Sequence, residues 1–258
     1  MNQSPLDIYM FPCLSDNYGF LIHDIDNKLT ATIDTPEVSA IEQALDFKGW
    51  NLTHIINTHH HYDHAGGNLE LKNKTNCQII GPEMDQERIP GIDKKIGHEE
   101  VFYFGIHKVI CYHTPGHTTG HVVYYFQDQK IAFVGDTLFA MGCGRLFEGT
   151  PEQMWNSLNI ISNWPEETQL YCAHEYTKDN AEFAITIDPV NKNLIDRIKE
   201  VKEKRINDIP TVPTNVAIEK LTNPFLRASE SEIKQELDMI GHSDESVFAE
   251  IRRRKDSF

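Results

Sequence analysis

The segment of residues 58–67, with the sequence THHHYDHAGG, constrains this chain more than any other. It follows the apolar run at residues 54–57, which predicts a strand. Side chains two apart in an extended chain point the same way, so His59 and His61 face one point and His60 faces away. So many imidazole and carboxylate groups at one strand end are typical of a metal site, and such clusters seldom arise by chance. The potential ligands are His59, His61, Asp63 and His64.

Three later segments each place one more potential ligand after a predicted strand: TPGH at 114–117, GDTLF at 135–139 and AHEY at 173–176. A single strand-terminal His or Asp is usually a cap or turn residue, but the repeated pattern favours a shared site. A catalytic zinc ion takes three protein ligands and keeps a position for water. Two such ions and one shared carboxylate need seven groups, which is the number present. The added ligands are His117, Asp136 and His174.

The count therefore favours a dinuclear site with a bridging Asp, because an imidazole has a single lone pair for a metal. Imidazole and carboxylate ligands suit zinc, iron or manganese. We expect two divalent ions per chain, with zinc as the first choice.

Apolar runs alternate with turn residues and helical patterns over the first two thirds of the chain, which predicts an α/β fold. Residues 178–205 and 229–254 are charged, amphipathic and predicted to be helical. We expect a metal-binding catalytic domain over 1–174 and a helical domain over 175–258. The predicted strands are 30–34, 52–58, 77–81, 108–113, 121–126, 130–135 and 169–173, and the predicted helices are 39–45, 68–72 and 151–162, the last with a capping sequence at Thr150, Pro151 and Gln153.

Charge and composition limit the partners. The chain has 258 residues and a formal net charge of −15, which argues against a nucleic-acid or anionic membrane surface. The first twenty residues lack the basic start and apolar run of a signal peptide. Five dispersed cysteines, without a CxxC pair, indicate reduced thiols. We expect a cytoplasmic monomer without a membrane span, and expect Cys143 to be a buried residue in a tight turn rather than a nucleophile.

At these motifs the chain resembles the metallo-β-lactamase superfamily and, more narrowly, the glyoxalase II (hydroxyacylglutathione hydrolase) family. SDNY at 15–18, GCGRLFEGT at 142–150, NPFLR at 223–227 and the C-terminal residues 252–258 extend the match to both ends. The resemblance implies an αββα sandwich with the metals at one edge and a C-terminal helical domain that binds substrate.

The resemblance also implies which metal each ligand holds. His59, His61 and His117 would hold one ion, and Asp63, His64 and His174 the other. Asp136 and a hydroxide would bridge them, so that Asp63 and Asp136 count as catalytic residues. Asp34 matches an Asp that supports the metal loop, although a simple turn before Pro36 fits it equally well.

The implied reaction is hydrolysis of S-D-lactoylglutathione, a thioester, to glutathione and D-lactate, the second step of methylglyoxal detoxification. Residue by residue, the resemblance places five side chains at the substrate. Animal members carry Lys and Tyr at positions 145 and 147, so Phe147 removes one hydroxyl from that site. From the residues alone, the basic run at 252–255 fits a solvated helix end. The five are Arg145, Phe147, Tyr176, Arg252 and Lys255.

Other functions fit parts of the pattern. A persulfide dioxygenase of the same fold, with one iron, is the main alternative, although such enzymes generally lack the helical domain. A nuclease of the superfamily would need a basic surface. The intact ligand set argues against a non-catalytic metal-binding scaffold. The metal site does not determine the acyl group, so a lactonase or another thioesterase stays an alternative to a glutathione thioesterase.

Overall fold

The computed structural model describes residues 6–258, so the first five residues of the segment considered for a signal peptide lie outside it. The described chain forms two compact units. The first comprises residues up to 113 together with 119–135, and the second comprises 114–118 and 136–258. This division differs from the predicted boundary after residue 174, which stays a prediction. No helix among the described residues is both long and apolar enough to cross a membrane.

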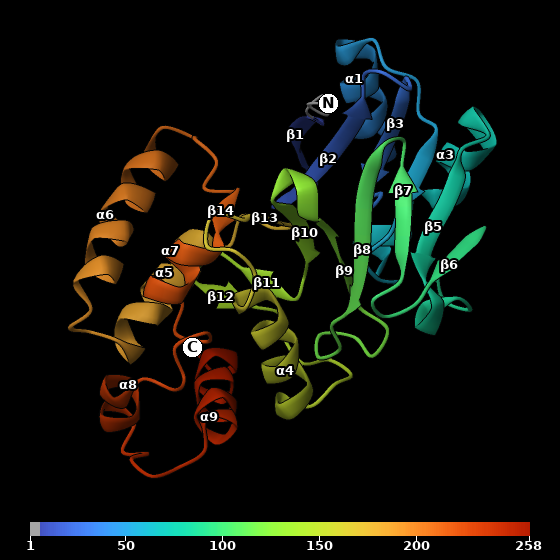
Figure 1. Ribbon diagram of the computed structural model, residues 1–258. Helices are drawn as coiled ribbons and strands as arrows, with labels where there is room; N and C mark the ends of the chain where they lie inside the picture. The colour runs from blue at the N-terminus through green and yellow to red at the C-terminus, as the bar shows by residue number, and fades with distance from the viewer. Residues whose placement is uncertain (1–5) are drawn as a thin grey trace. The chain divides into compact units, whose positions relative to one another are not determined.

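The first unit contains a six-stranded sheet in the order β1-β2-β3-β4-β5-β6 (Figure 1). Strands β1 to β3 pair antiparallel, and β3 to β6 pair parallel through connections that include helices. Because parallel strands end at the same edge, the loops after β3 and β4 lie side by side. The elements are β1 (Asp7–Cys13), β2 (Asn17–Asp24), β3 (Leu29–Ile33), α1 (Val38–Lys48), β4 (His54–Ile56), α2 (Tyr62–Ala65), α3 (Asn68–Thr75), β5 (Gln78–Pro82), η1 (Glu83–Asp85) and β6 (Lys94–Ile96).

Four antiparallel strands in the order β10-β9-β8-β7 form the second sheet of this unit. The two sheets face each other across an apolar core in which the ring centroids of Phe20 and Phe133 lie 5.5 Å apart. On the other face of the first sheet, Ile41 of α1 and Leu71 of α3 are buried in one apolar cluster with Ile55 of β4. The strands are β7 (Val101–Phe104), β8 (His107–His113), β9 (Val122–Phe126) and β10 (Ile131–Gly135), with η2 (Gln127–Gln129) before β10.

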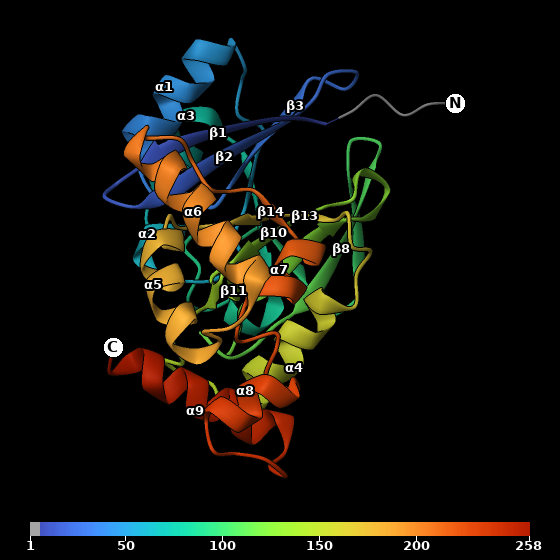
Figure 2. The same cartoon turned by 90° about the vertical axis from the view of Figure 1, so that its left-hand side faces the viewer.

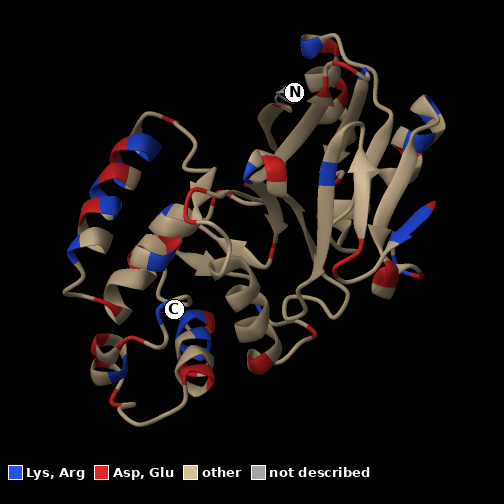
Figure 3. Ribbon diagram, in the orientation of Figure 1, with Lys and Arg blue, Asp and Glu red and all other residues tan. Residues whose placement is uncertain are grey.

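The second unit begins with a short hairpin and is otherwise mainly helical. Helices α5 and α6 pack against each other, and α4 packs against α9 (Figures 1 and 2). Basic and acidic residues are interspersed along α6 (Figure 3). The elements are β11 (Leu138–Phe139), β12 (Gly142–Cys143), α4 (Pro151–Ser162), β13 (Gln169–Cys172), α5 (Thr177–Ile187), α6 (Lys192–Ile206), β14 (Thr214–Asn215), α7 (Val216–Thr222), α8 (Ser231–Glu236) and α9 (Asp244–Asp256).

Two local expectations have clear outcomes in this unit. Helix α4 spans the predicted residues, and Thr150 and Gln153 form the predicted capping box, an N-cap worth about 1 kcal/mol. The expectation of a tight turn at Cys143 is wrong, because Cys143 lies in strand β12 and pairs with Leu138 of strand β11. The turn lies earlier, where Met141 adopts φ 56°.

Candidate metal centre

The loop after β4 and the short helix α2 that follows it carry the four potential ligands of the first unit, two in each. Their backbone is fixed from several sides. The Tyr124 hydroxyl donates to the Asn57 carbonyl at 2.7 Å, and the Asn57 amide donates to the His64 carbonyl at 2.8 Å. Asn68 Nδ2 donates to Asn57 Oδ1 at 2.7 Å. These buried hydrogen bonds hold the loop rigidly, as a site that binds a ligand requires.

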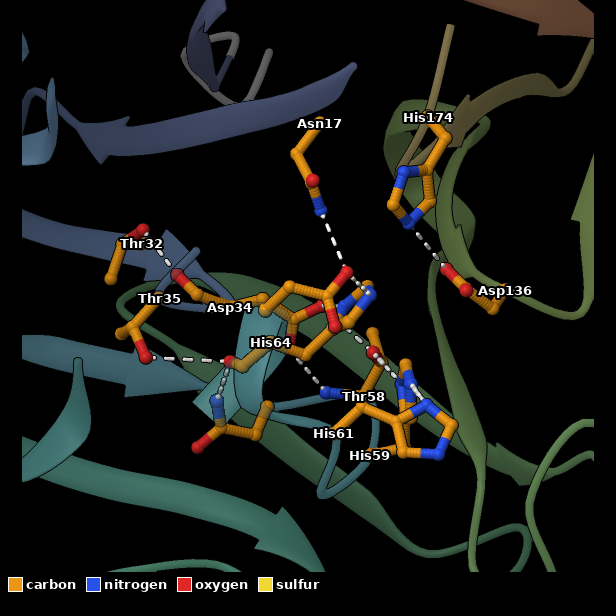
Figure 4. Close-up of polar contacts among 12 residues, drawn as sticks. Asn17, Thr32, Asp34, Thr35, Thr58, His59, His61, His64, Asp136 and His174 are labelled. Carbon is orange, nitrogen blue, oxygen red and sulfur yellow. Dashed lines mark hydrogen bonds and ion pairs between the residues drawn. The ribbon is translucent and has the colours of Figure 1, made fainter. Parts of the chain in front are cut away.

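Asp34, directly after β3, is the main support of this loop. It is only 5% exposed and adopts φ 60°, a left-handed conformation that Asp tolerates. Its carboxylate accepts hydrogen bonds from the Thr58 backbone at 2.7 Å and the Thr58 hydroxyl at 2.8 Å (Figure 4). Its Oδ2 also lies 2.8 Å from His64 Nδ1. Asp34 therefore supports the metal loop, as the resemblance implies, and is more than a turn residue.

The ligand atoms of the first unit face one another. His59 Nε2 lies 3.0 Å from His61 Nδ1, and His64 Nε2 lies 3.4 Å from an oxygen of Asp63. The rings of His59 and His64 are 4.0 Å apart between centroids. Asn17, which the sequence did not single out as a site residue, donates from Nδ2 to the same Asp63 oxygen at 3.1 Å.

His60, which the sequence predicts to face away from its neighbours, contacts other groups. Its Nδ1 lies 3.0 Å from Asp85 Oδ2, and Arg88 donates to the other oxygen of Asp85. His60 therefore helps to hold the loop after β4 through Asp85, and it is not among the candidate metal ligands.

The remaining three candidate ligands belong to the second unit and also converge. Asp136 is placed between two imidazoles: its Oδ2 lies 3.3 Å from His117 Nε2, and its Oδ1 lies 3.5 Å from His174 Nε2. Figure 4 shows the His174 ring pointing toward the Asp136 carboxylate. All three side chains are buried.

The orientation of these rings is set by their surroundings. His117 Nδ1 donates to the Arg145 carbonyl at 2.9 Å, because a carbonyl can only accept. Its Nε2 lone pair therefore faces Asp136. The His174 ring stacks on Tyr176 at 4.7 Å between centroids, with 6° between the planes. Phe147 contacts the His117 ring edge-on at 5.2 Å.

This donor chemistry fits a divalent cation. A neutral imidazole lone pair and a carboxylate oxygen repel each other at 3.3–3.5 Å unless positive charge lies between them. Imidazoles whose second nitrogen donates to an oxygen are also the usual ligands of zinc and iron sites. Each unit thus presents a set of side chains suited to holding metal.

The predicted substrate residues all lie in the second unit. Arg252 is 4% exposed, donates from Nη1 to the Cys143 carbonyl at 2.9 Å, and pairs with Asp256 at 2.7 Å. Lys255 donates to the Asp179 carbonyl at 3.1 Å, and burial together with the charges of Arg252 and Arg145 lowers its pKa. The basic residues at 252–255 therefore do not form one solvated group. Arg252 is buried, whereas Arg253 is exposed and pairs with Glu250.

Similarity to known proteins agrees with the site. Residues 29–174 match the family described as the metallo-beta-lactamase superfamily, and residues 175–258 match the one described as the hydroxyacylglutathione hydrolase C-terminus. A hydroxyacylglutathione hydrolase from Maricaulis maris is 54% identical over 255 residues, which cover 99% of this chain and 100% of the relative. The chain belongs to the hydroxyacylglutathione hydrolase family. A second hydroxyacylglutathione hydrolase, from Brucella abortus strain 2308, is 52% identical over 253 residues, 98% of each chain.

Solved structures of low sequence identity share the fold. ETHE1 from Myxococcus xanthus superposes with a TM-score of 0.67 at 22% identity, over 97% of this chain and 99% of that one. A metallo-β-lactamase from Staphylococcus aureus subsp. aureus COL gives 0.66 at 20% identity, over 99% of this chain and 72% of that one. The predicted α/β class and metallo-β-lactamase fold are confirmed.

Proposed function

We propose that this chain hydrolyses S-D-lactoylglutathione to glutathione and D-lactate, the second step of methylglyoxal detoxification. The observation that carries the proposal is the end-to-end similarity to hydroxyacylglutathione hydrolases in a chain that has all seven ligand-type side chains in the segments that follow strands. In this proposal residues 1–174 form the catalytic domain and residues 175–258 the helical domain that binds substrate.

The proposed ligand sets join the two groups of side chains described above. His59, His61 and His117 would hold one ion; Asp63, His64 and His174 would hold the second; and Asp136 would be shared. When bound, two divalent cations, zinc first and iron or manganese next, supply an ionised water near neutral pH and positive charge beside the thioester carbonyl.

The protein's own contribution is to hold these ligands in one orientation. Asp34 accepts the Nδ1 proton of His64 and the hydroxyl of Thr58, and the Arg145 carbonyl accepts the Nδ1 proton of His117. Asn17 donates a hydrogen bond to the Asp63 carboxylate. Fixed donors of this kind lower the reorganisation that binding and reaction would otherwise require.

Positive charge in the second unit suits the substrate. Glutathione carries two carboxylates, and a chain of net charge −15 needs a local cationic site to bind them. The charge of Arg145 helps to lower the pKa of Lys255, and an anionic group that contacted both side chains would offset this repulsion. We assign Tyr176 and Phe147 to the thioester end, because they pack against His174 and His117. Arg252, which donates to the Cys143 carbonyl, would complete the set of substrate-binding residues.

The bond changes need no protein nucleophile. Water oxygen adds to the thioester carbon, the C–S bond breaks, and its electron pair leaves with sulfur. A glutathione thiol has a pKa of about 8.5, so the thiolate is a fair leaving group without a dedicated general acid. Cys143 is buried, and burial raises the pKa of its thiol to about 11, which does not suit a nucleophile.

Location and assembly complete the proposal. We expect a cytoplasmic monomer that binds neither nucleic acid nor membrane. Five buried cysteines that form no disulfide and the net negative charge support that expectation.

Loss of thioester absorbance with S-D-lactoylglutathione, compared with an acyl-coenzyme A, tests the proposal directly. We expect turnover of the glutathione thioester to be at least a hundredfold more efficient. Metal analysis should give two ions per chain. One iron per chain with oxygen uptake on glutathione persulfide would instead identify a persulfide dioxygenase and overturn the proposal.

A further inference from the structure

Glu219, on α7, has a fully buried carboxylate whose two oxygens accept four hydrogen bonds. Oε2 accepts from the Met141 backbone and from Asn223 Nδ2, both at 2.9 Å. Oε1 accepts from Arg197 Nη2 at 2.5 Å and from the Thr214 hydroxyl at 2.6 Å. A carboxylate has about four acceptor positions, so Glu219 is fully used. Oε1 thus carries the ion pair with Arg197, and Oε2 carries the contact with the Met141 backbone.

The backbone contact holds the turn of the β11–β12 hairpin. Met141, at that turn, has φ 56°, a conformation that costs a residue with a side chain about 1 kcal/mol and persists only where its surroundings enforce it. Asn223 Nδ2, whose two hydrogens are shared among three acceptors, also lies 3.2 Å from the Phe139 carbonyl oxygen and 3.0 Å from the Gly142 carbonyl oxygen. Side chains at the end of α7 therefore fix both strands of the hairpin and its turn.

This hairpin joins two residues of the candidate site. Asp136 lies two residues before β11, and Arg145 lies two residues after β12. The two ends are tied together, because Gly144 N donates to the Thr137 carbonyl at 3.4 Å. Phe139 of the hairpin also contacts His174 edge-on at 5.7 Å. A shift of the turn would therefore move Asp136 and Arg145 together.

We propose that Glu219 is a positioning residue, which sets the hairpin so that Asp136 is placed for metal and Arg145 for substrate. The inference rests on the proposed function for the roles of those two residues. In this proposal Glu219 itself contacts neither the metal nor the substrate. Loss of its bond to Met141 should weaken metal binding and raise KM together, whereas loss of the ion pair alone should change only stability.

Two double variants separate these effects. Arg197→Met with Glu219→Gln and Arg197→Met with Glu219→Met both remove the ion pair. Only the Gln variant keeps an oxygen for the Met141 N–H, with its amide NH₂ directed to the Thr214 hydroxyl. Replacing a buried ion pair by apolar residues is often neutral for stability, so both chains should fold.

Zinc affinity, measured by competition with a chromophoric chelator, is the main readout, together with metal per chain and the KM for the thioester. We expect the Gln variant to lie within threefold of the wild type. We expect the Met variant to bind zinc at least tenfold more weakly, the usual scale for lost ligand support, with a raised KM. Equal zinc affinity and equal KM in the two double variants would overturn the inference.

Asp188→Asn is the matched control. Asp188 is also buried in the second unit, but its carboxylate bonds to Asn191 and Arg227. This variant should melt at a lower temperature with unchanged zinc affinity. If the Met double variant does not fold, Asn223→Ala, which keeps the ion pair, must show the same loss of zinc affinity. Zinc binding needs no substrate, so a failure of thioester hydrolysis would overturn the proposed function alone.

Discussion

His64 Nδ1 lies 2.8 Å from Asp34 Oδ2, and this contact joins the residue that follows β3 to helix α2, which comes after the adjacent parallel strand β4. A carboxylate accepts, so the proton of the His64 ring resides on Nδ1 and the lone pair on Nε2. One buried residue therefore decides which nitrogen of His64 is offered to a metal, and the same carboxylate fixes Thr58 at the start of the loop.

Asp34→Asn should lower zinc affinity by about 10- to 100-fold, because an amide cannot accept from both Thr58 and His64 as the carboxylate does. Chelator competition gives the affinity. Asp24→Asn is a suitable control, since Asp24 is a buried aspartate at the end of β2 in the same unit and accepts from the backbone N–H groups of Asp26, Asn27 and Ile106. Unchanged zinc affinity in Asp34→Asn would show that Asp34 supports only the loop backbone.

Lys255→Met should raise the KM for S-D-lactoylglutathione several-fold and leave kcat within about twofold, because binding remote from the reacting bond is similar in ground and transition states. Steady-state kinetics separate the two constants. Lys178→Met serves as the control, because Lys178 is exposed and pairs with Glu182. A hundredfold fall in kcat with an unchanged KM would contradict the assignment of Lys255 to binding.

The cysteines should not react in the native protein. All five are buried, and burial raises the pKa of Cys13 to about 12 and that of Cys143 to about 11. A chromogenic disulfide reagent at pH 7.5 should therefore label none within minutes, and five in guanidinium chloride. Rapid labelling of one thiol in the folded chain would contradict this expectation.

Glu250 should make stability depend on acid pH. The guanidinium groups of Arg253 and Arg254 lower its pKa from 4.5 to about 2. The folded state thus favours the ionised form, so the stabilisation is present above pH 4.5 and is lost as the pH falls toward 2. Glu250→Gln should lower the Tm by about 1–3 °C at pH 7, as expected of a solvent-screened pair.

The Tm difference between Glu250→Gln and the wild type should shrink as the pH is lowered from 5 toward 3. Glu236→Gln, at an exposed position on α8, provides the comparison. A difference that grows on acidification would have the wrong sign for a depressed pKa.

Local patterns account for what the sequence predicted well. Chain geometry within the THHHYDH segment accounts for His60 facing away from His59 and His61, and α4 carries its own start signal in Thr150 and Gln153. The helical prediction over 178–205 was incomplete, because the helix ends at Ile187 and a new one begins at Lys192. Pro189, which lacks a backbone N–H, lies in that break.

Long-range contacts account for what the sequence did not predict. Asn17 reaches Asp63 across 46 residues, and Glu219 reaches Met141 across 78. Asn17 lies in the SDNY segment that carries the resemblance, but no spacing or periodicity gave it or Glu219 a role, and Asn and Glu are usually exposed whereas both of these are buried. Strands β1 and β2 were also missed. Strand β1 carries Pro12, which weakens a strand pattern.

The hold of Glu219 and Asn223 on the β11–β12 hairpin also limits where this protein can be divided. A truncated fragment that stopped at residue 174 would retain Asp136 and His174 but would lose α7 and all four acceptor bonds that centre on Glu219. The turn at Met141 would then rest on its own strained backbone. The boundary between the two matched families is therefore a poor place for a dissection or a domain exchange, and grafts should carry α7 along with the ligands.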